Sequence, residues 1–191
     1  MHLISSILST LAVASVVNGY TVDPNLKDGL YYISFIPNST HEVASYGEPY
    51  RLSIVKPFNS PESLNILPKR HVVGKVPFPT DSDICYDSVE IQPEYEAATK
   101  ILSDWCDKGK KIPSHARWNA GLILSRYGSS LAWTCSLGGK QGCAPNEIED
   151  AWSQIADKCN GILAGGELCA SKWKKCYGHS TVKGMVCGNM T

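Results

Sequence analysis

The sequence has no excess of charge of either sign, because 18 lysines and arginines balance 18 aspartates and glutamates over 191 residues. Proteins that bind nucleic acids or anionic membranes through basic patches usually carry a positive field, so we expect neither partner. Beyond its N-terminal end the sequence has no apolar run long enough to span a membrane. It also has no Gly-x-Ser-x-Gly, His-Glu-x-x-His or phosphate-binding motif, and so no local signature of the enzymes that use them.

Charged residues are absent from the largely apolar stretch between Leu3 and Val17. This stretch is too short to span a membrane comfortably, and small residues follow it, as in secretory signal peptides. We expect cleavage after Gly19, with Ala14 as the second choice, and a mature protein that is secreted to the extracellular space. The alternative is a buried N-terminal helix.

Cysteine is absent from the first 84 residues, and all eight cysteines follow, at Cys85, Cys106, Cys135, Cys143, Cys159, Cys169, Cys176 and Cys187. An even number of cysteines in a secreted chain predicts four disulfides. The alternative is a zinc site, but the sequence has none of the closely spaced cysteine pairs that form zinc knuckles. We therefore expect disulfides, no metal and no cofactor, and the pairing stays open.

Proline is concentrated before residue 84, where eight of the eleven prolines lie. Within this part, β-branched and aromatic residues predict strands over 29–36 and 50–55, and residues 57–83 are expected to form an extended connection. The predicted parts are a signal peptide over 1–19, a cysteine-free, proline-rich segment over 20–84, and a cysteine-rich domain over 85–191.

For the cysteine-rich domain we predict an α+β fold, with a small antiparallel sheet, two helices packed on it, and disulfides that staple the two. The first helix should begin near Pro93 and stop at Gly109, and the second should be capped by Asn146 and end at Asn160-Gly161. Strands are expected over 121–124 and 131–135 around a turn at 127–130, with closing strands over 166–173 and 185–187.

Both helices carry a cysteine on the apolar face that the three- and four-residue spacing predicts. These are Cys106 and Cys159, so we expect each to form a disulfide that links its helix to the sheet.

Three processing signals follow from local sequence. Asn38 and Asn189 fit the N-glycosylation sequon. The stretch 67–70, Leu-Pro-Lys-Arg, is similar to the dibasic sites that kexin-type proteases cut in the secretory pathway. Cleavage after Arg70 would release the cysteine-free part as a propeptide, whereas the alternative is an exposed Lys-Arg pair.

Two groups of residues could carry catalysis, and each has a simpler interpretation. His115 and Arg117 are similar to the acid–base and cation pair of a small secreted ribonuclease, or they lie in a solvated turn. Glu147, Glu149 and Asp150 could act as paired carboxylates in glycoside chemistry, but a charged first helical turn explains them better.

A basic and aromatic stretch is the candidate binding site. Lys172, Trp173, Lys174 and Lys175 could hold an anionic glycan or a lipid headgroup. A core tryptophan beside solvated lysines explains the same residues equally well.

The cysteine-rich part resembles small secreted cysteine-rich proteins of filamentous fungi, on the stretches 131–143, 147–159, 164–166, 173–178 and 186–188. The resemblance implies a candidate effector that acts by binding, and it carries no catalytic residues. Cys169 and Cys176 are additions to the usual pattern of these proteins, and we expect them to pair with each other.

The leading hypothesis is a non-enzymatic, virulence-associated fungal effector that acts in the host apoplast or after uptake. We expect a monomer that binds a host protein or glycan, or a competitor's. One alternative is a small secreted hydrolase or toxin, ribonuclease-like or killer-toxin-like, with His115 in a cleft. The other is a fungal surface or glycan-binding protein, with Trp173 or Trp118 exposed as a flat platform. A protein-binding effector could show only an apolar patch.

Overall fold

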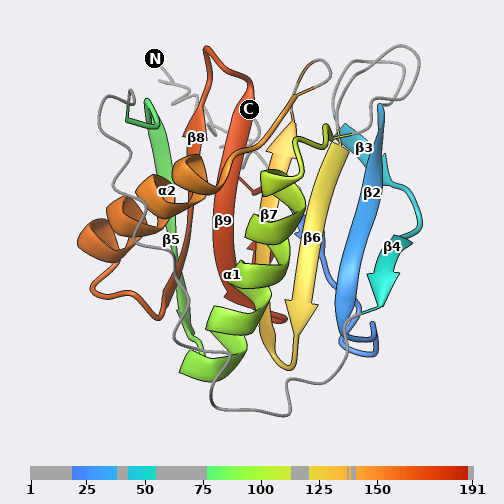
Figure 1. Ribbon diagram of the computed structural model, residues 1–191, viewed down its shortest axis with the longest axis horizontal. Coiled ribbons are helices and arrows are strands. Elements are labelled where there is room, and N and C mark those ends of the chain that lie inside the picture. The colour runs from blue at the N-terminus through green and yellow to red at the C-terminus, as the bar shows by residue number, and fades with distance from the viewer. Residues whose placement is uncertain are drawn as a thin grey trace, which may run out of the picture.

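The computed structural model describes residues 19–37, 43–54, 77–112, 121–136, 138 and 141–188, and all statements about structure concern these residues. Two helices lie side by side over one face of a twisted antiparallel sheet (Figure 1). The elements are β1 (Tyr20–Thr21), β2 (Gly29–Pro37), β3 (Val43–Tyr46), β4 (Tyr50–Ile54), β5 (Ser82–Val89), α1 (Gln92–Asp107), β6 (Gly121–Tyr127), β7 (Ser130–Ser136), α2 (Pro145–Lys158), β8 (Ala164–Ala170), β9 (Lys175–Thr181) and β10 (Met185–Val186).

The main sheet has eight strands in the order β3-β2-β6-β7-β9-β8-β5, with β4 also pairing with β2. The short strands β1 and β10 form a separate pair. Helix α1 packs on β6 and β7, and α2 packs on β8 and β9 (Figure 1). The predicted α+β class and the two helices are therefore confirmed, whereas the prediction of a small sheet is wrong.

The central strands are buried on both faces, which explains their nearly continuous apolar sequence. On the helix-covered face, Ile123 and Ala132 pack against α1 and α2. On the opposite face, Leu122 and Trp133 pack against residues near the two chain ends, including Val22 and Val186. We call this second surface the rear face of the sheet.

Both helices begin with a proline in the first turn, where the missing N–H costs nothing. Helix α1 ends just before Gly109, whose φ of +63° confirms the predicted stop. The predicted cap of α2 is wrong, because α2 starts at Pro145 and Asn146 lies inside its first turn. The predicted end of α2 is confirmed, since Asn160 and Gly161 both have positive φ.

Three strands of the main sheet, β3, β5 and β9, were not predicted. Strand β5 starts at Ser82, near the end of the stretch expected to be a connection, and alternates half-buried and exposed residues at the sheet edge. The side chains of Lys175 and His179 in β9 are buried, so this strand is buried although its sequence is polar. The strand predicted over 166–173 ends at Ala170, and residues 171–174 form the turn that leads into β9.

The N-terminal part contributes an internal strand. β2 lies between β6 on one side and β3 and β4 on the other. Its ladder with β6 runs over the six residues 29–34, which pair with 126–121. β2 and β4 correspond to the two strands predicted before residue 57.

The eight cysteines form four disulfides, so the disulfide interpretation is confirmed and the zinc alternative is replaced. The pairs are Cys85–Cys159, Cys106–Cys143, Cys135–Cys187 and Cys169–Cys176. The first joins the end of α2 to strand β5, as expected for Cys159. The second joins α1 to the loop before α2 and does not reach the sheet, so the expectation for Cys106 is wrong. The last confirms the pair that the resemblance implied.

Candidate functional site

The turn between β8 and β9 is the candidate site that is best defined in the structure. It consists of residues 171–174, here called the basic turn, and follows directly from the Cys169–Cys176 disulfide, which joins opposed residues of the two strands. The Ser171 backbone N–H donates to both carboxylate oxygens of Asp81, at 3.0 and 2.9 Å. The Gln141 side-chain amide donates to the Trp173 carbonyl at 2.8 Å. The turn is therefore fixed by the disulfide at its base and by hydrogen bonds from two other segments.

Trp173 is half-buried and holds the turn against the body of the protein. Its ring meets the Phe78 ring edge-on, with centroids 5.7 Å apart. The Lys175 Nζ lies 5.8 Å from its centroid, a cation–π contact on the ring. Trp173 is thus an anchor with one accessible side and not the flat exposed platform that a sugar-stacking site would require.

Lys175 is buried, which corrects its assignment to the candidate binding surface. Its Nζ lies 2.8 Å from Glu147 Oε2. The Tyr177 hydroxyl donates to the same carboxylate oxygen at 2.5 Å. Burial, with the Glu147 charge second, raises the pKa of Tyr177 well above its usual range, so the phenol stays a donor. These three groups fix α2 to β9 and leave Lys175 unavailable for a ligand.

Lys172 and Lys174 are both exposed and form the accessible part of the basic turn. Lys174 has a φ of +52°, a left-handed conformation that turns often need. Its aliphatic chain lies over Gly138, where an added Cβ would meet Lys174 Cδ at 2.7 Å. Residues 172 and 173, which were predicted to end a strand, therefore lie in this turn instead.

The carboxylates at the start of α2 have structural partners. Glu147 binds Lys175 and Tyr177, as described above. Asp150 Oδ2 accepts hydrogen bonds from the Phe78 N–H at 2.6 Å and from the Gln154 side-chain amide at 2.9 Å. Glu149 also has a partner. The structure therefore does not arrange these residues as a pair of carboxylates facing a cleft.

A buried histidine–carboxylate pair was missed at the sequence level. His179 Nδ1 lies 2.5 Å from Glu90 Oε2, and neither side chain is exposed. The rings of Tyr95 and Trp152 lie 5.0 and 4.9 Å from the histidine ring. Such a pair can orient a general base, but here the ring is fully buried beneath residues of α1 and α2. The alternation of β9, with Lys175, Tyr177 and His179 two residues apart, was the signal that could have placed His179 inside.

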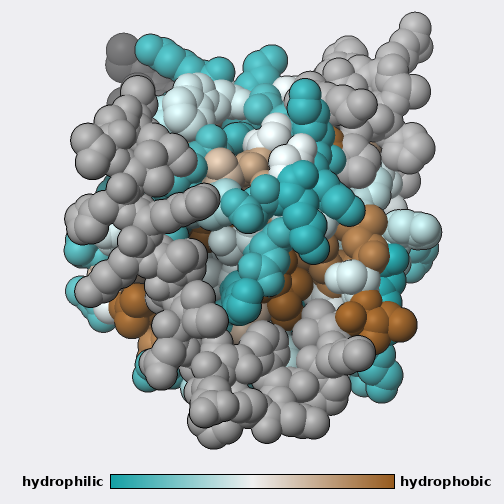
Figure 2. Space-filling view, viewed as in Figure 1, coloured by the Kyte–Doolittle hydropathy of each residue, from teal (hydrophilic) through white to brown (hydrophobic). Residues whose placement is uncertain are grey.

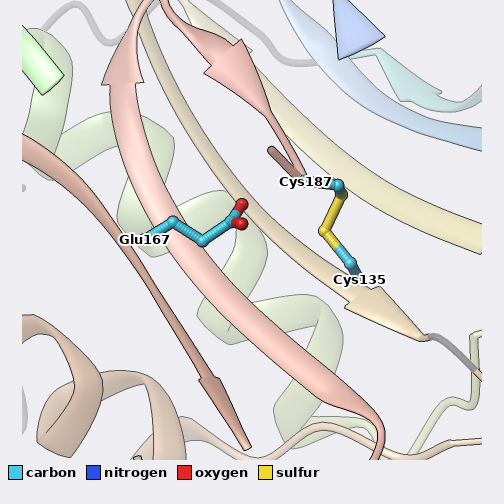
Figure 3. Close-up of side chains that lie close together, drawn as sticks. All are labelled: Cys135, Glu167 and Cys187. Carbon is cyan, nitrogen blue, oxygen red and sulfur yellow. A yellow bond between two sulfur atoms is a disulfide. The ribbon is translucent and has the colours of Figure 1, made fainter. Parts of the chain in front are cut away.

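Glu167 is a second buried carboxylate and lies in the rear-face core. Figure 3 shows its carboxylate directed toward the Cys135–Cys187 disulfide. Its Oε2 accepts a hydrogen bond from the Trp133 indole at 2.8 Å, and Cys169 Sγ lies 3.8 Å from Oε1. The carboxylate lies close enough to the four surrounding sulfurs for these groups to share a metal ion. Because all four sulfurs are in disulfides, they offer no thiolate to a metal.

Several predicted positions lie outside the described residues. These are Asn38 and Asn189 of the sequons, Arg70 of the processing site, His115 and Arg117 of the ribonuclease-like pair, and Trp118. Gly19 is the first described residue, and β1 starts immediately after it. Within the described part of the chain, no helix is both long and apolar enough to cross a membrane.

The four disulfides fit a protein of an oxidising compartment, where such bonds form and persist. The sequence matches no known protein family, and no curated protein or solved structure matches it.

Proposed function

We propose that this protein is secreted and acts as an effector-type binding protein, which contacts an acidic target through the basic turn. The observation that carries the proposal is the construction of this turn. Lys172 and Lys174 are exposed, while the backbone of the turn is held by the flanking Cys169–Cys176 disulfide, by the Asp81 carboxylate at Ser171 and by the Gln141 amide at Trp173.

The fixed backbone of the turn lowers the entropy cost of binding through the two lysines. An exposed lysine on a mobile loop loses conformational entropy when it binds, and this loss offsets most of its Coulomb gain. Here the half-buried Trp173 and the Cys169–Cys176 disulfide fix the backbone before a ligand arrives. On binding, the lysine side chains still lose conformational entropy, but the backbone of the turn is already ordered.

The surface fits a polyanion with a repeating charge better than a folded protein. Asp81 is the carboxylate that contacts the turn. It accepts hydrogen bonds from the Ser171 N–H and hydroxyl, and in the described structure it forms no ion pair with either lysine. The turn is only four residues long, whereas a typical protein interface takes roughly 20–30 residues from each partner. We therefore assign an acidic cell-wall polysaccharide as the target class, reached after secretion.

The test is a binding titration with polygalacturonate, with dextran as the neutral control. The protein should bind polygalacturonate and not dextran, and the affinity should fall as salt rises. The variant with Lys172→Ala and Lys174→Ala should bind about tenfold more weakly. Lys183→Ala is the matched control, since Lys183 is an exposed lysine in the turn at the other end of β9. Absence of binding, or an equal loss in the control, would refute the proposal.

A protein target is the second candidate and rests on a different surface. Val89, Ile91 and Ile162 are 78%, 55% and 56% exposed. They are neighbours, because Val89 pairs with Ala164 and the Glu90 N–H donates to the Leu163 carbonyl. We call these three residues the apolar corner, and they lie at the opposite end of β8 from the basic turn.

Exposed aliphatic residues that gather at one place often mark a protein contact. In Figure 2 the described surface on the helix side is mostly hydrophilic, and its hydrophobic areas are separate from one another. If the target is a protein, Val89→Asp with Ile91→Asp should abolish the response of host tissue to the purified protein, while the double lysine variant should keep it. The reverse result would exclude the apolar corner.

A further inference from the structure

Three cysteines lie side by side across three neighbouring strands on the rear face. Cys169 of β8 is the register partner of Cys176 of β9, and Cys176 is also the register partner of Cys135 of β7. The first two are bonded to each other, while Cys135 is bonded to Cys187 beyond β10. Two disulfides therefore meet in one continuous row, and Cys176 has two cysteine neighbours.

The row permits an alternative pairing. Opposed residues of antiparallel strands have Cα atoms about 4.5–5.5 Å apart, within the range that a disulfide spans. The side chains of Cys135 and Cys176 point to the same face, because register partners do so. A Cys135–Cys176 disulfide could thus form without movement of the sheet.

A carboxylate is placed to move the proton that such an exchange requires. One Glu167 oxygen lies near the sulfurs of Cys135 and Cys187, and one near those of Cys169 and Cys176. Figure 3 shows the Glu167 side chain pointing from β8 across the neighbouring strand β9 toward the first of these disulfides. Trp133 donates to the carboxylate and holds it in this position.

We propose that this row is a thiol–disulfide exchange site, which takes an external dithiol as its co-substrate. The dithiol reduces Cys135–Cys187 and is itself oxidised to a disulfide, which leaves two protein thiols. Glu167 accepts the proton of the Cys135 thiol, and the thiolate attacks Cys176 Sγ. The Cys135–Cys176 bond forms, the Cys169–Cys176 bond breaks, and Cys169 leaves as a thiolate that takes the proton back from Glu167.

The exchange would release the C-terminal segment and keep the sheet crosslinked. Cys187 becomes a free thiol, so β10 loses its covalent link to β7 and keeps its two register pairs with β1 and the packing of Val186. The new bond still joins β7 to β9. A protein that moves from an oxidising to a reducing compartment would thus uncover part of the rear-face core and retain its fold.

Access to the row depends on the same terminal segment, because Cys135, Cys176 and Cys187 are fully buried. Reduction must therefore follow local opening at β1 and β10, the shortest strands of the fold. The Cys85–Cys159 and Cys106–Cys143 disulfides lie on the helix-covered side and do not belong to the row.

The variant Cys187→Ser tests the exchange without any reductant, because it leaves Cys135 as a thiol beside an intact disulfide. After incubation, acid quenching and alkylation, tryptic mapping should find the Cys135–Cys176 linkage and alkylated Cys169. Lys172, Lys174 and Lys175 place Cys169 and Cys176 on separate peptides. The matched control is Cys159→Ser, which leaves a thiol at Cys85 on the helix-covered side and should keep its three other disulfides.

Glu167→Gln in the Cys187→Ser variant should slow the exchange severalfold and give the same product, since glutamine still accepts from Trp133 but carries no proton acceptor of carboxylate strength. An unchanged rate would contradict the role of Glu167. If Cys187→Ser does not fold, limited dithiothreitol treatment of the unaltered protein gives the same readout. A Cys169–Cys176 bond that persists in every molecule with reduced Cys135 would overturn the proposal.

Discussion

His179 in the centre of the sheet and Glu90 at the entrance to α1 share a hydrogen bond of 2.5 Å in a fully buried setting. The pair connects a strand to the segment from which the first helix starts, and the rings of Tyr95 on α1 and Trp152 on α2 pack on the histidine. The His179–Glu90 hydrogen bond is therefore buried at the place where both helices pack on the sheet.

Removal of one partner should be strongly destabilising. Glu90→Ala leaves an unpartnered polar ring in the core, and breaking such buried pairs costs about 3–5 kcal/mol of unfolding free energy. The control is Asp104→Ala, which breaks the exposed Lys100–Asp104 pair and should cost less than about 1 kcal/mol. Chemical denaturation measures both. Similar small losses in the two variants would show that the buried pair does not stabilise the fold.

The four disulfides should contribute unequally. Cys85–Cys159 closes a loop of 74 residues, whereas Cys169–Cys176 closes one of only 7. The chain-entropy estimate gives roughly 4 kcal/mol for the first and roughly 2 kcal/mol for the second. Denaturation of the two double-alanine variants should therefore rank Cys85–Cys159 as the more costly loss. The opposite ranking would show that local packing around the hairpin outweighs loop closure.

Two glycines with similar backbone conformations form a matched pair. Gly128 and Gly109 have φ values of +58° and +63°. Alanine at either position carries the left-handed penalty of about 1–2 kcal/mol. At Gly128 the added Cβ would also meet the Glu94 carboxylate at 2.4–2.7 Å, which receives hydrogen bonds from Ser129, while nothing lies near Gly109. Gly128→Ala should thus lower the melting temperature more than Gly109→Ala. Equal shifts would mean that the Glu94 contact does not matter.

The N-terminal strands should remain bound if the chain is cut after Arg70. The described residues before this site contain no cysteine, so no disulfide holds them, but β2 pairs with β6 along six residues. The Arg126 guanidinium also donates to the carbonyls of Asp23 and Pro24, at 3.1 and 2.9 Å.

Cleavage in this region should therefore give two fragments that co-elute in native gel filtration and separate on a denaturing gel without reductant. Dissociation under native conditions would show that the segment is a removable propeptide. A band that separates only with reductant would contradict the disulfide pairing.

The sequence predicted the elements whose local signals agree with their environment. Both helices have a proline at the start, a regular apolar face and a glycine near the end, and β6 and β7 are apolar around Gly128. Strand β9 was not recognised, because an alternation that includes Lys175 and His179 indicates a buried strand only if their partners Glu147 and Glu90, which are distant in sequence, are known.

The candidate site was predicted only in part, because some of its contacts again come from residues that are distant in sequence. Exposure of Lys172 and Lys174 follows from their turn, but the burial of Lys175 depends on Glu147 from α2. Adjacency of Cys135, Cys169 and Cys176 depends on the strand order β7-β9-β8, which no local pattern specifies.

The most direct test of the proposed binding site is a titration with oligogalacturonate, followed residue by residue through backbone amide chemical shifts. If the basic turn binds the ligand, the largest shifts should map to residues 171–174 and to Gln141, which donates a hydrogen bond to the Trp173 carbonyl. Shifts centred on Val89, Ile91 and Ile162, or no shifts at all, would contradict binding through the basic turn.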